Sequence, residues 1–315
     1  MTLSLDKLRT IRTIVTHDNC ADGTVSALLL KDALPDAEVV FLQHGTEAFK
    51  TLQAKPGMLF CDFSPPADRV QEFVDAGATV LDHHKTAKAV VERFGENGIF
   101  ADEVTEPGVS GAMLAFREVW LPVRQTRGDT TPWLVAVVTH FATLTAIRDT
   151  WQNKDERWVE ACKLANLLHF QPNTEWLKIP LPTLMTNWAD TYEWIGEVLH
   201  TKHEKAVTKT LGKSGQYQSR KGTRIVAMNS TSHTSDACEK LGQEADLIVG
   251  FGYEVENGAE KIILSFRSHT GYNCAALARF LHGGGHTAAA GASIPVSGES
   301  PYATILRVVN NFELL

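Results

Sequence analysis

The chain has 315 residues and a formal net charge of −7; 43% of its residues are hydrophobic and 21% are charged. This composition is typical of a globular protein with enough length for two domains, each with its own core. The acidic balance argues against broad, non-specific binding to duplex DNA, which depends on many lysine and arginine contacts to phosphate, and leaves room for a local basic pocket.

The sequence also predicts the cellular location of the protein. No apolar run approaches the roughly 20 residues that cross a bilayer, so we expect no membrane partner. The five cysteines form no C-x-x-C pair and are odd in number. We therefore expect reduced thiols and a cytoplasmic protein.

Short apolar segments alternate with helix-like segments over the first 120 residues. Strands are predicted at 13–16, 38–42, 57–63 and 78–84, and helices at 23–34, 67–77, 86–95 and 108–120. Strands that alternate with helices of about ten residues indicate an α/β domain with a doubly wound, mostly parallel sheet. Continuous apolar runs such as MLF and TVL suit strands that are buried on both faces.

The middle of the chain, 131–199, has a helical pattern, and all seven tryptophans lie in or just before it. We expect these tryptophans to pack helices against the sheet; the alternative is an aromatic platform for stacked bases. Residues 200–222 are polar and basic, which predicts an interdomain linker. The domain before it, with its helical extension, is expected at 1–199.

The last part of the chain, 223–315, predicts a second, smaller α/β domain. Its expected strands are 223–229, 246–255 and 261–268, and its expected helix is 274–281. A glycine-rich segment, HGGGHTAAAGASI, follows the helix. Glycines without a Cβ allow the backbone to approach a phosphate and direct N–H groups at it.

Aspartate and histidine residues follow three of the predicted strands, at the point where each strand ends. They are His17, Asp18 and Asp22 in THDNCADG, where Asn19 also lies, Asp62 in CDFSP, and Asp82, His83 and His84 in LDHH. Because loops at the carboxyl ends of parallel strands converge, ligands bind there, and we expect these side chains to lie close together.

Carboxylates and imidazoles without a thiolate cage suit divalent ions such as Mn²⁺, Mg²⁺ or Zn²⁺. Two ions about 3.5–4 Å apart can share a carboxylate and clamp a phosphorus centre. The alternative use of these residues is a nucleophilic triad, which needs a serine on a strained G-x-S-x-G turn. The nearest match, GVSGA at 108–112, has the wrong glycine spacing and lies in a helix-like stretch. The pattern therefore favours a metal site.

The motifs resemble those of the DHH phosphoesterase superfamily, in its DHH–DHHA1 form. The resemblance covers nearly the whole chain through THDNCADG, CDFSP, LDHH, AIRDTW, SFRS (265–268) and GGGHTAAAG (283–291). The H-x-N-C-x-D-G form is similar to the branch of nano-RNases and cyclic-nucleotide phosphodiesterases. The resemblance implies a DHH domain followed by a DHHA1 domain, and one or two Mn²⁺ ions, or Mg²⁺ or another divalent ion, at the site.

The resemblance also implies roles for single residues in the first domain. Asp62 would bridge two ions, and Asp22, His83 and Asp149 would hold the second of them. His17 would help to hold the first ion. Asp82, His83 and His84 form the catalytic motif, in which Asp82 would support the metal site and serve as one of its ligands. His84 would contact the substrate or leaving group. In the second domain the substrate would be bound by Arg267, Ser268, Gly283, Gly284, Gly285 and His286.

One position departs from the family pattern. If Asp22 aligns with the second aspartate of the first motif, Cys20 stands where a carboxylate is usual, and the spacing from His17 is one residue short. Asp18 or Asn19 could replace that carboxylate, although both residue types also stabilise turns. Three possibilities for the first metal site stay open. It binds its ion more weakly, it prefers a softer ion because Cys20 provides a thiolate ligand, or it is empty.

The expected function is hydrolysis of short oligonucleotides, or of linear or cyclic dinucleotides, to mononucleotides. One alternative is a single-strand-specific exonuclease, which would need a continuous basic groove. Another is a nucleotide-binding sensor whose catalytic centre has decayed, for which Cys20 is the main support. The glycine-rich GGGH motif disfavours an inorganic pyrophosphatase of the DHH type. Duplex DNA and membranes are not expected partners, and a homodimer is left open.

Overall fold

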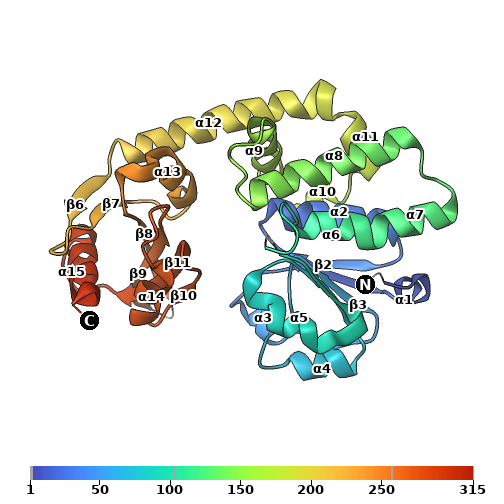
Figure 1. The fold of residues 1–315 in the computed structure, drawn as a ribbon, viewed down its shortest axis with the longest axis horizontal. Coiled ribbons are helices and arrows are strands. Elements are labelled where there is room, and N and C mark those ends of the chain that lie inside the picture. Colours follow the sequence, from blue (N-terminus) through green and yellow to red (C-terminus); the bar gives the residue numbers. More distant parts are fainter. Residues whose placement is uncertain (1–2, 103, 257, 315) are drawn as a thin grey trace. The chain divides into compact units, whose positions relative to one another are not determined.

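The computed structural model describes residues 3–102, 104–256 and 258–314, and the chain divides into two compact units, Met1–His200 and Thr201–Leu315. The first unit contains a five-stranded sheet with the order β2-β1-β3-β4-β5, in which every neighbouring pair is parallel (Figure 1). Its strands are β1 (Thr13–His17), β2 (Glu38–Leu42), β3 (Met58–Cys61), β4 (Thr79–Asp82) and β5 (Gly98–Phe100). The predicted doubly wound sheet is confirmed.

Helices cover both faces of this sheet (Figure 1). Leu59 and Leu81 pack in one core with residues of α2 (Ala21–Ala33), α6 (Gly111–Ala115) and α8 (Pro132–Asp149). Phe60 and Val80, the next residues along β3 and β4, pack in a second core on the opposite face, with α4 (Val70–Asp75) and α5 (Lys88–Val91). Successive side chains of a strand point to opposite faces, so strands covered on both sides have continuous apolar runs.

The remaining helices of the first unit surround these two layers. They are α1 (Leu5–Arg9), α3 (Glu47–Lys50), α7 (Leu121–Arg127), α9 (Trp158–Leu168), α10 (Asn173–Trp176), α11 (Leu181–Thr186) and α12 (Glu193–Leu211), of which the last continues into the second unit. Three tryptophans, Trp120, Trp176 and Trp188, are buried as expected for helix packing, whereas Trp133 and Trp194 are exposed. No helix in the described ranges has the length and apolar character that a membrane span requires.

Two local features of the first unit differ from the sequence prediction. Only Lys88–Val91 of the helix expected at 86–95 is α-helical, with 3-10 turns on either side, and after Gly95, which has a left-handed φ of 56°, the chain turns into the unpredicted strand β5. The helix expected at 108–120 begins only at Gly111, where Ser110 accepts a hydrogen bond from the backbone N–H of Met113. Ser110 is therefore the N-cap of α6.

The second unit contains a six-stranded mixed sheet with the order β10-β11-β9-β8-β7-β6. Its strands are β6 (Gly215–Gln218), β7 (Arg224–Met228), β8 (Leu247–Glu256), β9 (Ala259–Arg267), β10 (Gly284–Gly285) and β11 (Ala289–Pro295). Its helices are α13 (Thr234–Leu241), α14 (Cys274–Phe280) and α15 (Pro301–Glu313). Apolar residues of α14 and α15 share a core with Ile225 and Ala227 of β7. A smaller α/β unit was predicted, and it is confirmed.

The segment 200–222, for which the sequence predicts a linker, is largely folded. Helix α12 runs through it to Leu211, and Val207 is buried against Met228 and Ala237. Strand β6 then pairs with β7 at the edge of the second sheet. The exposed face of a helix and an edge strand are both polar, so their composition resembles that of a linker.

Candidate metal centre

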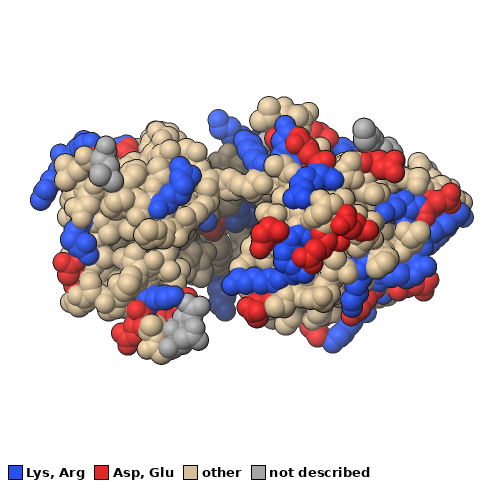
Figure 2. Space-filling view, turned by 90° about the horizontal axis from the view of Figure 1, so that it is seen from below, with Lys and Arg blue, Asp and Glu red and all other residues tan. Residues whose placement is uncertain are grey.

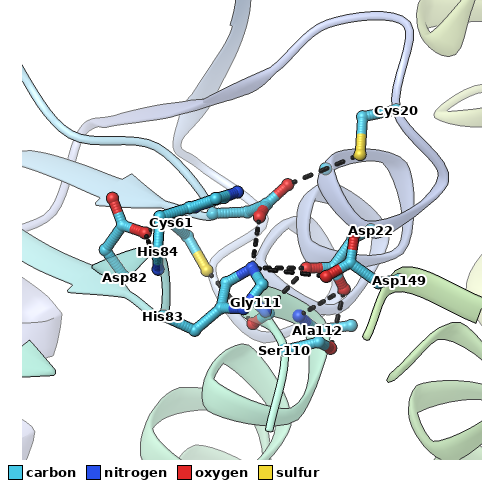
Figure 3. A network of polar contacts seen from close by, with 12 residues as sticks. Cys20, Asp22, Cys61, Asp82, His83, His84, Ser110, Gly111, Ala112 and Asp149 are labelled. Atoms are coloured by element: carbon cyan, nitrogen blue, oxygen red, sulfur yellow. Dashed lines mark hydrogen bonds and ion pairs between the residues drawn. The ribbon is translucent and has the colours of Figure 1, made fainter. Parts of the chain in front are cut away.

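The predicted site residues of the first unit meet at the carboxyl edge of the parallel sheet. His17 is the last residue of β1, Asp62 directly follows β3, and Asp82 is the last residue of β4. Two helices complete the set: Asp22 lies in the first turn of α2, and Asp149 is the last residue of α8 (Figure 3). The doubly wound order places these segments next to one another, because β1, β3 and β4 are neighbours in the sheet.

The imidazole of His83 lies at the centre of three carboxylates (Figure 3). Its Nε2 is 3.1 Å from Oδ1 of Asp62, 3.5 Å from Oδ2 of Asp149 and 3.6 Å from Oδ2 of Asp22. Ligand atoms of Asp22, His83 and Asp149 all lie within 4.8 Å of one another. This separation allows one ion to contact all three residues.

Asp62 faces two sets of ligands at once. One carboxylate oxygen, Oδ1, is directed at His83, and the other, Oδ2, is 3.7 Å from Sγ of Cys20. The residue has a left-handed φ of 57°, which is uncommon for a residue with a Cβ and marks many functional sites. A carboxylate with its two oxygens turned to different ligand groups is suited to bridging two ions.

Asp22 is oriented by the start of α6, a contact that the sequence did not predict. Its Oδ1 accepts hydrogen bonds from Oγ of Ser110 (2.8 Å) and from the N–H of Ala112 (2.9 Å), and its Oδ2 accepts one from the N–H of Gly111 (2.6 Å). A Cβ on Gly111 would lie 2.3 Å from Cβ of Asp62, so only glycine allows this approach. Ser110 thus orients a carboxylate and caps a helix, and it does not lie on the strained turn that a nucleophilic serine needs.

Asp82 holds His84. Its Oδ1 accepts hydrogen bonds from the N–H of His84 (3.0 Å) and from Nδ1 of the same residue (2.8 Å), and its Oδ2 accepts one from Oγ of Ser64 (2.5 Å). Burial alone would raise the pKa of Asp82, but these bonds outweigh burial and hold that pKa below its ordinary value. Asp82 is in none of the groups of candidate ligands found among the described residues, whereas His84 forms one with Asp62 and His83.

A second group of ligand atoms lies beside the first, and it consists of His17, Cys20 and Asp62. Nε2 of His17 is 3.2 Å from Oε1 of Gln43, which orients the ring. Asp18 lies outside every candidate ligand group of the described residues; its Oδ1 accepts a hydrogen bond from the N–H of Asn19. Of the two titratable candidates, the structure thus brings Cys20 and not Asp18 to this position.

The electrostatics of the centre fit a bound cation. Burial and the neighbouring Asp22 and Asp149 carboxylates raise the pKa of Asp62 well above its usual range. Burial and Asp22 also raise the pKa of Asp149 to about 6. Three carboxylates packed this closely repel one another, and a divalent ion removes that repulsion. The oxygen and nitrogen donors are those that Mn²⁺, Mg²⁺ and Zn²⁺ accept.

The metal-free protein is expected to lose stability as the pH rises from about 4 through about 6. In this range folded Asp149, with a pKa near 6 in place of 3.8, still holds its proton. The unfolded chain has released that proton, so the free energy of unfolding falls with pH. Thermal unfolding in EDTA and in Mn²⁺ checks this: Mn²⁺ should raise Tm more at about pH 8 than at about pH 5. A Tm gain that does not change with pH would contradict the prediction.

In the second unit, Arg267 ends β9 and holds a guanidinium without an acidic partner in the described part of the chain. Its Nε donates to Oγ of Ser235 (2.9 Å), and its Nη1 donates to Oγ of Ser265 (3.2 Å) and to the carbonyl of Phe266 (2.8 Å). Burial lowers the pKa of Arg267. A partly buried guanidinium paired only with neutral groups can bind an anion.

The glycine segment lies on the neighbouring strands of the same sheet, since β11 pairs Ala289 with Arg267, and β10 pairs with β11. A Cβ on Gly283 would lie 2.2 Å from the carbonyl oxygen of Gly291, and Gly285 has a φ of 132°. Both glycines are therefore required by the fold. Gly284 differs, because a Cβ there would meet no atom within 4 Å.

Two further predicted substrate contacts have different surroundings. Ser268 is 3% exposed, and its Oγ accepts hydrogen bonds from the N–H groups of Thr270 (3.3 Å) and Tyr272 (3.1 Å), so it stabilises the turn after β9. His286 is exposed between β10 and β11. The structure brings Arg267, Gly284 and His286 to the same sheet, and their contact with a substrate stays a prediction.

Comparison with known proteins agrees with this architecture. Residues 223–312 match the family model of the DHHA1 domain. A search of curated proteins finds no match to the chain. Among solved structures, a DHH-domain protein described as a member of a family of ribosomal proteins has a TM-score of 0.62 at 12% identity, over 98% of this chain and 87% of that chain.

Two structures of the exonuclease RecJ are also similar to this chain. One, bound to manganese, has a TM-score of 0.61 at 15% identity, over 98% of this chain and 91% of that one. The other, from Thermus thermophilus with Mn²⁺, has a TM-score of 0.56 at 16% identity, over 100% of this chain and 56% of that one. At such identities the likeness is one of fold. Residues 223–312 thus carry a DHHA1 domain, and the chain as a whole shares its fold with these DHH-domain and RecJ structures.

Proposed function

We propose that the chain is a divalent-metal-dependent phosphodiesterase that hydrolyses short oligonucleotides or dinucleotides to mononucleotides. The observation that carries this proposal is the convergence of Asp22, Asp62 and Asp149 on Nε2 of His83. Mn²⁺ is the proposed ion, with Mg²⁺ as the other candidate, because the donors are oxygen and nitrogen and the similar RecJ structures contain these ions.

The residues of the metal centre have different proposed roles. Bound divalent ions would neutralise charge on the phosphoryl oxygens and activate the attacking water. Asp62 would contact both ions, and the start of α6 fixes the direction of Asp22. His84, whose side chain is 38% exposed and whose Nδ1 is bonded to Asp82, presents its other ring nitrogen to the leaving group.

Short substrates suit the surface better than long strands do. The net charge is −7, and on the face shown in Figure 2 basic and acidic side chains are interspersed. A processive single-strand exonuclease needs a basic groove that follows the backbone over many nucleotides. In the second unit, Arg267 would bind one phosphate of a short substrate, and Gly284 leaves open space for its approach.

A series of substrates of increasing length tests this proposal. Purified protein is incubated with Mn²⁺ and a 5′-phosphorylated dinucleotide, a pentanucleotide, a long single strand or a cyclic dinucleotide, and mononucleotide release is followed, with EDTA as the control. We expect EDTA-sensitive release that is fastest on substrates of two to five nucleotides. Faster release from the long strand would favour the exonuclease. Nucleotide binding without release in Mn²⁺ or Mg²⁺ would favour the sensor.

Replacing Gly284 with alanine is expected to raise the KM for the dinucleotide by about tenfold, because a phosphate held away from this backbone would make a weaker hydrogen bond to Arg267, and to leave Tm unchanged. The added methyl group has open space in the free protein but would stand between the backbone and a phosphate. Gly283→Ala is the matched control and should instead lower Tm, because its Cβ would overlap the carbonyl of Gly291. An unchanged KM in Gly284→Ala would remove this backbone from the substrate site.

A further inference from the structure

Cys20 differs from the chain's other cysteines in its surroundings. The other four cysteines are buried, and three of them, Cys61, Cys238 and Cys274, are members of apolar cores. Cys20 is partly exposed, belongs to no apolar core of the described residues, and directs its Sγ at Oδ2 of Asp62, 3.7 Å away. Packing therefore does not account for a thiol at this position.

The local backbone does not need a cysteine there either. Cys20 occupies the N-cap of α2, where serine, threonine, aspartate or asparagine would bond the first free N–H groups. Its side chain makes no capping hydrogen bond. The position thus forgoes the usual stabilisation of a helix start, and the thiol is turned to the metal centre (Figure 3).

The donors around Cys20 differ in kind from those around His83. The group of Asp22, His83 and Asp149 offers oxygen and nitrogen, whereas the group of His17, Cys20 and Asp62 adds a sulfur. Thiolates select Zn²⁺ and similar ions over Mg²⁺ and Mn²⁺. Three protein ligands with a fourth position left open are also the usual arrangement of catalytic zinc sites.

We propose that His17, Cys20 and Asp62 form a thiolate-containing site for an ion of the Zn²⁺ class, beside an oxygen-and-nitrogen site for Mn²⁺ or Mg²⁺. The inference rests on the proposed metal centre and gives it two unlike ions, joined by Asp62. On binding, the Cys20 thiol becomes a thiolate ligand and its proton passes to solvent. The sulfur would replace the missing carboxylate of the first motif.

Cobalt provides a spectroscopic test that does not depend on turnover. Metal-free protein under reducing conditions is titrated with Co²⁺, and the near-ultraviolet thiolate-to-cobalt charge-transfer band is recorded. We expect a band that saturates at one ion per chain, is lost in Cys20→Ser and is displaced by Zn²⁺. Cys61→Ser is the matched control and should keep the band, because that buried thiol bonds the carbonyl of Gly111 and lies outside the ligand groups.

A second variant keeps the test decisive if Cys20→Ser folds poorly. Cys20→Asp supplies the carboxylate usual in the family, and it should bind as many Co²⁺ ions without the band. A wild-type protein that binds Co²⁺ without the band, or a band that persists in Cys20→Ser or Cys20→Asp, would overturn the inference. A band without nucleotide hydrolysis would support the thiolate site and contradict the proposed function. Hydrolysis in Co²⁺ without a band would support the proposed function and contradict the thiolate site.

Discussion

Replacing Asp62 with asparagine is expected to reduce metal-dependent hydrolysis by more than about a hundredfold, since even residues that only orient metal ligands contribute 10–100-fold. The Asp62 carboxylate contacts both groups of candidate ligands, so its loss should lower the affinity for both ions. The metal-free variant should nevertheless be at least as stable as the wild type. Asparagine adopts the left-handed φ of this position readily, and the substitution removes a buried carboxylate from beside Asp22 and Asp149.

Three measurements check this prediction: turnover of the dinucleotide, calorimetric titration with Mn²⁺, and thermal unfolding in EDTA. Asp18→Asn is the matched control, because Asp18 lies nearby but outside the ligand groups, and asparagine can keep its bond to the N–H of Asn19. This control should retain turnover and Mn²⁺ binding. If Asp62→Asn kept wild-type turnover, or were less stable than the wild type in EDTA, our assignment of the bridging carboxylate would be wrong.

Replacing Arg267 with glutamine is expected to raise the KM of the dinucleotide by about 10–100-fold and to change kcat much less. A charge-assisted hydrogen bond to phosphate contributes about 1.5–3 kcal/mol to binding, which corresponds to this range. Arg267→Lys keeps the charge but loses the planar fork, so it should give an intermediate KM. Stability should change little, because the guanidinium has no acidic partner in the described chain to leave unpaired.

The matched control for Arg267 is Arg224→Gln in the same unit. The guanidinium of Arg224 is already paired, with Nη2 2.6 Å from Oδ1 of Asp246, so it has no free charge for a substrate. Steady-state kinetics of both variants on the dinucleotide should show a raised KM for Arg267→Gln alone. Equal KM values for the two variants would exclude Arg267 from phosphate binding.

The candidate ligand residues could be predicted from the sequence because each follows a strand or belongs to a short motif. Asp62 comes directly after an apolar run, and His83 follows the next one. The convergence of these ends is a general property of parallel sheets and needs no knowledge of side-chain contacts. The sequence therefore predicts where these candidate ligands meet in the fold.

The residues that orient the ligands could not be predicted in this way. Ser110, Gly111 and Ala112 lie 88 to 90 residues from Asp22 in sequence, and two of the three donors are backbone N–H groups, which any residue type provides. Ser64 could be noticed only after its contact with Asp82 was known. Such partners depend on the packing of α6 on the sheet, and no local pattern encodes that packing.

The segment 200–222 shows that residue composition alone does not distinguish a linker from folded structure. Its lysines, serines and glycines are typical of linkers, but most of its residues form the end of α12 and the edge strand β6. Single buried residues such as Val207 tie it to the second unit. A helix with few apolar residues and a four-residue strand have weak periodicity, so the tertiary contacts decide their structure.

The most direct test of the metal centre is a crystal structure of the protein with Mn²⁺, with anomalous scattering measured at the manganese absorption edge. We predict an anomalous peak in direct contact with Asp22, Asp62, His83 and Asp149. Its removal by EDTA, with the side chains otherwise in place, would identify a resident divalent ion. Full Mn²⁺ saturation without a peak among these residues, or with peaks only on surface carboxylates, would contradict the account.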